Sequence, residues 1–587
     1  MDNQRNIILA VVLTALILFG WDAGMRYFYP QAAQTQPAAT ASTSQDAAAP
    51  AKPTREGGLT SPADIALEAK DIKTALASPW RIRIAAPGLS GSLNPIGALV
   101  DDLMLNRHTA TVKKDSGPVR IFSPAGTPAQ NFAQFGWAGS GVQLPDAATP
   151  WSVPVGARLT PQTPVTLSWT NSTGQTFAIR YAIDGDYMLT ATQTVTNSGP
   201  APVTLRPIAQ INRTDQTASV DTWNVHSGPL GAFDQSVQFG PNYKDVREAG
   251  VVANQGRPDW LGFTDIYWMS ALIPDNAPAT SDFRALGKGI YLADVIYQDT
   301  ALAPGQQLTR TTRLFAGAKE SAVLDRYEDA GIAHFGLAID WGWFFWFEKP
   351  IFMLLTALFK AVGNFGVAII LLTVIVRGIM YPIAQRQFAS MAAMRAIQPK
   401  MKALQERHKD DREKLQQETM ALYKEEKVNP LAGCLPIFLQ IPVFFALYKV
   451  LIVAIEMRHQ PFILWIKDLS APDPLHILNL FGLLPFTPPS FLGIGILAVL
   501  LGITMWLQFK LNPAPPDPVQ QQVFALMPWM MMFVMAPFAA GLLLYWITSN
   551  ILTIAQQKYL YSKHPQMKAQ AGKEATDASR AAARPGK

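Results

Sequence analysis

The chain has 587 residues, of which 49% are hydrophobic and only 16% are charged, with a formal net charge of +6. The charged fraction is low against the roughly 25% of ordinary globular proteins. The single cysteine, Cys434, excludes a disulfide within the chain and a Cys-ligated zinc site, and the seven histidines follow no metal-binding spacing. With no phosphate-binding loop either, we expect no cofactor, no metal ion and no enzymatic reaction. The positive excess lies beside apolar segments, which argues against specific DNA binding.

The composition divides the chain into a polar part and an apolar part. Residues 31–330 are rich in Ser, Thr, Gln, Asn, Asp, Pro and Gly, whereas residues 341–560 are rich in Leu, Ile, Phe, Met and Trp. This division predicts a water-facing part joined to a membrane-embedded part.

At the N-terminus an apolar run at residues 7–21 follows Arg5. We predict that residues 1–29 form an N-terminal transmembrane anchor. A cleaved signal peptide is the alternative, with Ala32 and Ala33 as candidate cleavage positions. Residues 30–58 consist mostly of Ala, Gln, Thr, Ser and Pro and are predicted to be a flexible linker.

Residues 59–330 are predicted to fold as an all-β sandwich. Residues 176–183 and 187–197 are strand-like runs separated by the turn signal Asp184-Gly185-Asp186, which is typical of a hairpin. Further strands are expected at residues 81–85, 165–169, 203–211 and 308–315, followed by a helix at 321–330. Many short strands between turns favour a sandwich.

The aromatic segment that follows contains Trp341, Trp343 and Trp346. This density fits an interfacial amphipathic helix at residues 331–349, although it could equally be the beginning of the next span. Five membrane-spanning helices are predicted at residues 350–381, 429–456, 491–509, 523–537 and 541–560. The last two are separated because one apolar run at 523–553 is too long for a single ~30 Å crossing and contains Pro537 and Gly541.

The distribution of Lys and Arg among the loops predicts how these spans are oriented in the membrane. The loop 382–428 contains ten of them, the loop 457–490 only Arg458 and Lys467, and the tail from Lys558 seven. By the positive-inside rule, the loop 382–428, the short loop 510–522 and the basic tail 561–587 face the cytoplasm. The domain 59–330 and the loop 457–490 are then extracytoplasmic, and the N-terminus is cytoplasmic.

The loop 382–428 is predicted to form a cytoplasmic helical hairpin. Met391, Met394, Ile397, Met401 and Leu404 lie at spacings of three and four, and a polar break at residues 408–411 separates them from a second stripe. The stripes could pack the two helices together or, since Met adapts to many surfaces, bind a partner.

Arg377 closes the first apolar region of the core, and Thr373 lies one turn earlier on the same helix face. A charge within a span costs about 2.5–3.5 kcal/mol at its centre. Arg377 could extend its side chain to the cytoplasmic surface, or it could line a water-filled groove. Gln440, Thr548, Ser549 and Asn550 are further polar residues in apolar segments, for which hydrogen bonds between helices are the simpler explanation.

Several motifs occur together in the order found in a known family of membrane proteins. They comprise residues 376–382 (Val-Arg-Gly-Ile-Met-Tyr-Pro), 398–400 (Gln-Pro-Lys), 427–436 (Lys-Val-Asn-Pro-Leu-Ala-Gly-Cys-Leu-Pro), 440–442 (Gln-Ile-Pro), 468–471 (Asp-Leu-Ser-Ala), 545–546 (Tyr-Trp) and 549–550 (Ser-Asn). With these motifs the chain resembles the YidC, Oxa and Albino family of insertases, in the Gram-negative form with a large periplasmic domain. The pattern covers residues 335–560 strongly and the remainder in layout.

The resemblance implies an insertase of the bacterial inner membrane, with a groove open to the cytoplasm and to lipid. It places Arg377 in that groove, and it places Thr373, Gln440, Phe444, Tyr545 and Trp546 near the groove or the substrate. The family often has Tyr where this chain has Trp546. The implied partners are nascent membrane proteins, the lipid bilayer, the Sec translocon, the ribosome and signal-recognition targeting factors. The Pro-rich sequence at 475–490 is extra relative to the family, and nothing in the sequence assigns it a role.

Two other classes of function remain open on the residues alone. A transporter or channel would predict inverted repeats or paired broken helices, and no internal repeat is present. An anchored periplasmic binding module or enzyme is the other, because fold alone does not settle function.

Overall fold

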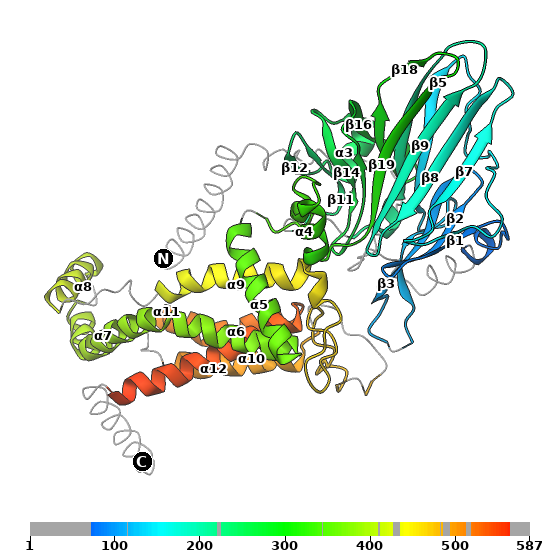
Figure 1. Cartoon of the computed structure of the whole chain (residues 1–587). Coiled ribbons are helices and arrows are strands. Elements are labelled where there is room, and N and C mark those ends of the chain that lie inside the picture. The colour runs from blue at the N-terminus through cyan, green and yellow to red at the C-terminus, as the bar shows by residue number, and fades with distance from the viewer. Residues whose placement is uncertain are drawn as a thin grey trace, which may run out of the picture. The chain divides into compact units, whose positions relative to one another are not determined.

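The computed structural model describes residues 72–563 apart from positions 114, 220–224, 343, 409–410, 427–434, 482, 485–492 and 512–517. The predicted anchor 1–29, the linker 30–58 and the basic tail beyond Lys563 lie outside the described residues. A β-rich domain comes first along the chain and a helical region follows (Figure 1).

In the described part of the chain, the strands of the β-rich domain form two sheets (Figure 1). The path of the first runs β13 (Val251–Ala253), β16 (Ala279–Gly287), β17 (Ile290–Tyr297), β10 (Val203–Thr214), β5 (Asn131–Ser140), β3 (Leu99–Thr109), β2 (Leu89–Asn94), β1 (Ile82–Ala85) and β6 (Arg158–Leu159), with β18 (Thr300–Leu302) on β10 and β4 (Pro118–Phe122) on β3. The second runs β12 (Ser236–Phe239), β11 (Gly228–Phe233), β14 (Pro258–Thr264), β15 (Trp268–Pro274), β19 (Gln307–Ala318), β9 (Met188–Asn197), β8 (Gln175–Ile183) and β7 (Val165–Thr170).

The two sheets pack face to face, as a sandwich requires. Burial alternates along β8 and β10, so every second side chain enters the core. Trp137 on β5 meets Phe177 on β8 at 5.0 Å between ring centroids, and the Tyr181 hydroxyl donates a hydrogen bond to the carbonyl of Ala98 at 2.8 Å. The predicted hairpin is confirmed, since β8 pairs antiparallel with β9. The strands predicted at 81–85, 165–169, 203–211 and 308–315 are confirmed as β1, β7, β10 and β19.

The described part of the domain also contains short helical segments, among them η2 (Asp215–Thr217), α3 (Tyr243–Ala249) and α4 (Ser321–Asp329). The last confirms the helix predicted at 321–330. Asn242 caps α3 by accepting a hydrogen bond from the backbone N–H of Asp245 at 2.9 Å, the arrangement that satisfies an otherwise unpaired donor of the first turn.

The helical region begins with η3 (Phe335–Ala338) and continues through α5 (Phe345–Val362), α6 (Phe365–Ile379), α7 (Tyr381–Arg407), α8 (Arg412–Glu425), α9 (Leu435–Val453), η5 (Ile455–Met457), α10 (Ile496–Leu511), α11 (Pro518–Met535) and α12 (Ala540–Lys563). Helices α7 and α8 contact each other, which confirms the helical hairpin. The two helices expected on either side of Pro537 are also confirmed, because a short turn separates α11 from α12.

The beginning of this region differs from the prediction. Residues 331–349 do not form one helix, because Gly342 takes a left-handed conformation with φ 72° between η3 and α5. The span predicted at residues 350–381 is not a single helix either, because it contains the end of α5, all of α6 and the beginning of α7. Gly363, with φ 71°, ends α5, and the Asn364 side chain caps α6 by accepting a hydrogen bond from the Val367 N–H at 3.1 Å.

None of the helices in the described ranges has both the length and the apolar character needed to cross a membrane.

Candidate functional site

Three helices position the six candidate residues. Thr373 and Arg377 lie on α6, Gln440 and Phe444 on α9, and Tyr545 and Trp546 on α12. The α6 pair and the α9 pair are each four residues apart, so each pair occupies one helix face. Helix α12 contacts both α6 and α9. It is therefore the element that brings the candidate residues together.

Arg377 contacts α12 through one hydroxyl group. Its guanidinium donates to the Ser549 Oγ from Nε at 3.1 Å and from Nη2 at 2.5 Å. Ser549 is only 2% exposed, whereas Arg377 is half-buried. Within the described residues, the phenol of Tyr545 lies near the guanidinium and no carboxylate pairs with it. A half-buried cation without a carboxylate partner can accept an acidic group from another molecule.

A second polar contact joins α9 to α12. Gln440 Nε2 donates a hydrogen bond to the hydroxyl of Tyr545, and the side chain of Tyr545 is buried. Because buried amide and hydroxyl groups are costly without partners, this bond fixes how the two helices face each other. Tyr545 thus lies between the α6 cation and the α9 amide.

Aromatic rings form the third contact. Phe444 meets Trp546 edge to face, with centroids 5.1 Å apart and an interplanar angle of 64°. Both side chains are partly exposed, so the pair presents apolar surface beside the polar groups.

Thr373 behaves differently from the other five residues. It is 1% exposed, and its hydroxyl donates to the carbonyl of Ile369 on its own helix at 2.7 Å. Although Thr373 lies on the same helix face as Arg377, its hydroxyl is bonded within α6, and the polar side chain that contacts Arg377 is Ser549.

Ser549 is the site residue that the sequence did not single out. It was grouped with Thr548 and Asn550 as a source of hydrogen bonds between helices. That interpretation is confirmed for Ser549 and for Asn550, which donates to Thr504 on α10 at 3.2 Å. Thr548 donates instead to Leu544 on its own helix at 2.8 Å.

The α7–α8 hairpin uses its apolar stripes to hold itself together. Ile397, Met401 and Leu422 are buried, and the Thr419 hydroxyl lies 3.7 Å from the sulfur of Met401. This favours the packing interpretation of the stripes over a partner surface.

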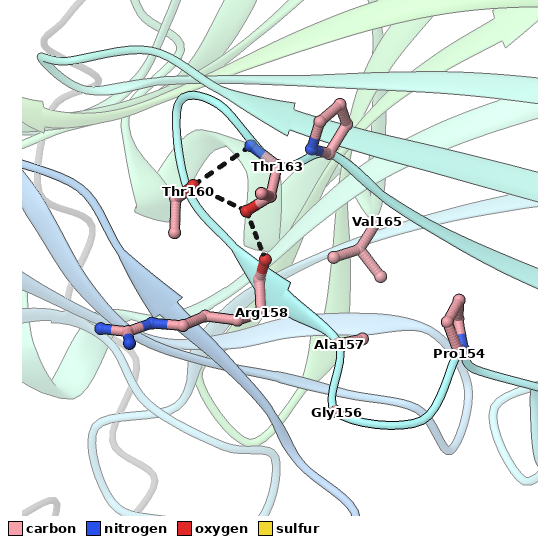
Figure 2. A pocket seen from close by; sticks show the side chains of 8 residues that line it. Pro154, Gly156, Ala157, Arg158, Thr160, Thr163 and Val165 are labelled. Carbon is pink, nitrogen blue, oxygen red and sulfur yellow. Dashed lines mark hydrogen bonds between the residues drawn. The ribbon is translucent and has the colours of Figure 1, made fainter.

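A hollow of about 400 Å³ lies on the β-rich domain (Figure 2). The side chain of Thr163 bonds to the hydroxyl of Thr160 at 2.6 Å and to the carbonyl of Arg158 at 2.8 Å, so the hydroxyls are used within the turn. Arg158 is the only ionisable residue of its lining. The hollow therefore lacks the paired acid and base that hydrolytic chemistry uses.

No group of three His, Cys, Asp or Glu side chains in the described ranges could hold a metal ion. The arrangement on α6, α9 and α12 offers a cation, an amide, a phenol and an aromatic pair. These groups can bind and orient a polypeptide.

Comparison with known proteins defines the class. Residues 81–354 match the YidC periplasmic domain, and residues 357–568 match the family described as 60Kd inner membrane protein. The chain is 44% identical to the membrane protein insertase YidC of Zymomonas mobilis and 43% identical to that of Rhizobium etli, with 96% of each chain covered in both cases. A solved structure of an active YidC insertase with its first transmembrane domain resolved is 19% identical, covering 82% of this chain and 92% of that one, with a TM-score of 0.37.

The two family matches define the class as a membrane protein with a β-rich periplasmic domain and a helical C-terminal region. It belongs to the YidC family of membrane protein insertases.

Proposed function

We propose that the protein inserts newly made membrane proteins into the bacterial inner membrane and helps them fold. In this proposal α6, α9 and α12 line a polar groove open to the cytoplasm and to lipid. Arg377, Gln440, Phe444, Tyr545 and Trp546 meet the substrate there, while Thr373 supports the wall from within α6. The observation that carries the proposal is the half-buried Arg377, which is bonded to Ser549 and has no carboxylate partner among the residues that the structure describes.

The physical problem is the transfer of short polar segments across a hydrocarbon layer ~30 Å thick. A groove that reaches partway into this layer shortens the barrier. At an effective dielectric constant of about 20, opposite charges ~4 Å apart attract by about 4 kcal/mol. Arg377 can therefore hold an acidic residue of the segment being translocated. Burial of the substrate's apolar helix in lipid, at about 25 cal/mol per Å², then drives the step without making or breaking a covalent bond.

The outer faces of the helices support a membrane setting. Large apolar side chains are exposed on α10 (Leu500, Ile503, Trp506) and on α11 (Phe524, Trp529, Phe533). Exposed apolar surface of this extent marks a face that contacts lipid or protein. We propose five spanning segments, formed by α6 with the beginning of α7 and by α9, α10, α11 and α12. Helix α5 is the better candidate for the interfacial helix, because it exposes Phe345 and Trp346 while burying Ile351 and Leu355.

The proposed topology places the α7–α8 hairpin, the N-terminus and the basic tail in the cytoplasm, and the β-rich domain in the periplasm. The hairpin would receive the nascent chain from the ribosome or from signal-recognition targeting factors, and the protein would act alone or beside the Sec translocon. These partners rest on the family resemblance.

Photo-cross-linking tests the site directly. A photoreactive residue at position 444 or 546 is predicted to cross-link to a ribosome-stalled membrane protein. A matched residue at Val155, which is exposed on the β-rich domain, is the control. Equal yields at all three positions would contradict the proposed groove.

A further inference from the structure

The connection between α9 and α10 exposes apolar side chains in place of polar ones. We define the apolar loop as residues 459–481 together with 483 and 484. Its exposed large hydrophobic residues are Ile463, Leu464, Ile477, Leu478, Leu480, Phe481, Leu483 and Leu484. Leu464 and Leu483 are each 81% exposed. The loop contains three charged residues, of which only Lys467 is exposed.

The backbone of the apolar loop satisfies many of its own hydrogen-bonding groups. The N–H of Phe462 donates to the Ile466 carbonyl at 3.0 Å, and that of Leu469 donates to the Gln460 carbonyl at 2.9 Å. In the second half of the loop, the N–H of Phe481 donates to the His476 carbonyl at 2.9 Å. This pairing covers part of the backbone beneath the exposed apolar side chains, and the remaining backbone groups need water or lipid headgroups as partners.

Asp473 fixes the apolar loop to the helices. Its buried carboxylate accepts hydrogen bonds from the Trp465 indole at 3.0 Å and from the backbone N–H of Leu497, in the first turn of α10, at 2.8 Å. Gly495 permits this approach, because a Cβ there would lie 2.5 Å from the Asp473 Cβ. Helix α12 is attached as well, since the Gly541 N–H donates to the Leu469 carbonyl at 2.9 Å.

Three of the exposed apolar residues have an unfavourable backbone conformation. Leu464, Leu480 and Phe481 adopt positive φ values of 54°, 49° and 59°, which bulky residues rarely take. These residues are also among the exposed ones. The apolar tips are thus fixed features of the loop, which is where strained backbone is expected when exposure serves a purpose.

We propose that the apolar loop lies on the periplasmic leaflet, with its backbone at the level of the headgroups and the tips of its exposed apolar side chains inserted among the acyl chains. This inference rests on the proposed function, because the topology there puts the loop on the periplasmic side. Lipid is the occupant that the structure favours. The Ile477 N–H donates to the Ile494 carbonyl at 3.0 Å, just before α10, and α10 exposes Leu500 near its beginning, so the loop lies beside the apolar outer surface of α10. The described part of the extra sequence, residues 475–481 with 483 and 484, thereby acquires a role as a membrane-surface anchor.

Depth-dependent quenching in proteoliposomes tests the proposal on the full-length chain. Cys434 is first replaced by Ser, and single cysteines are introduced as Leu464→Cys or Leu483→Cys and labelled with an environment-sensitive fluorophore. Val155→Cys provides the water-exposed control, and Leu500→Cys on α10 provides the lipid-facing one. Both loop sites are already highly exposed, so labelling should leave the fold intact.

We expect quenching of both loop labels by spin-labelled acyl chains and, because water is excluded there, iodide quenching about fivefold or more below that at position 155. Iodide quenching equal to that at 155, with position 500 still quenched by lipid, would overturn the loop proposal alone. If position 500 is also open to iodide, the membrane-spanning proposal itself fails. Protection from iodide without quenching by lipid would show that protein covers the loop, a second copy or a partner, and would also overturn the inference.

Discussion

The contact between Arg377 and Ser549 predicts a measurable energetic coupling between α6 and α12. The Ser549 hydroxyl accepts two N–H groups of the guanidinium, at 3.1 and 2.5 Å, and Ser549 is buried. Hydrogen bonds to charged groups contribute about 1.5–3 kcal/mol. Removal of either partner should therefore weaken the attachment of the two helices, and removal of both should cost less than the sum of the two single changes.

The assay is a double-mutant cycle with Arg377→Met and Ser549→Ala. Unfolding in detergent micelles, followed by tryptophan fluorescence, supplies the free energies of unfolding. We expect a coupling energy of about 2 kcal/mol, equivalent to about 30-fold in the unfolding equilibrium constant. Thr548→Val is the matched control, because that hydroxyl bonds only to the Leu544 carbonyl of its own helix; its coupling to Arg377→Met should stay below about 0.5 kcal/mol.

A coupling energy for Ser549 no larger than that for Thr548 would refute the reasoning. It would mean that the guanidinium finds other partners at no cost when the hydroxyl is absent. Ser549→Thr, which retains a hydroxyl, should preserve most of the coupling.

Three further predictions concern stability. Burial lowers the pKa of Lys319 to about 8, so between pH 8 and 10.5 the unfolded chain binds more protons than the folded one. The free energy of unfolding should therefore rise with pH in that window, and Lys319→Met should abolish the rise in a pH series of thermal melts. Burial, followed by the charge of Asp282, raises the pKa of Asp294 to about 7. The free energy of unfolding should therefore fall as pH rises toward 7, and Asp294→Asn should stabilise the domain at pH 8 but not at pH 4. A Cβ at Gly366 would lie 2.0 Å from the Phe462 ring, so Gly366→Ala should lower the free energy of unfolding by about 1–3 kcal/mol, and an unchanged value would show that the ring moves freely.

Local signals in the sequence predicted the local elements well. The β8–β9 hairpin follows from two alternating runs around Asp184-Gly185-Asp186, and the α11–α12 turn follows from Pro537 inside a run too long for one helix. The neighbours of β10 could not be predicted in the same way. It lies between β5 and β17, and that order depends on contacts between distant residues.

The break between α5 and α6 shows why an apolar run can hide a helix boundary. Gly363 and Asn364 are ordinary ending and capping signals, but they lie inside a segment whose composition alone fits one span. The structure separates α5 from α6 at this point. The span predicted at 350–381 rested on apolar composition and did not use these capping signals, although capping decides where a helix ends.

The candidate site was only partly predictable for the same reason. The helix period places Thr373 and Arg377 on one face, but it does not show that Thr373 bonds to its own helix. Ser549 lies 172 residues from Arg377 in sequence. Their contact follows from the packing of α6 on α12, for which the sequence carries no local signal.

The central claim is tested most directly by insertion into proteoliposomes that contain this protein as the sole membrane component. A small two-span membrane protein is synthesised in their presence, and protease-protected fragments are compared with those from empty liposomes and from an Arg377→Ala preparation. The account predicts protection with the wild-type protein, a clear reduction with Arg377→Ala, and none above background in empty liposomes. Equal protection in wild-type and empty liposomes would contradict insertase activity by this chain alone, and equal protection with Arg377→Ala would remove Arg377 from the mechanism.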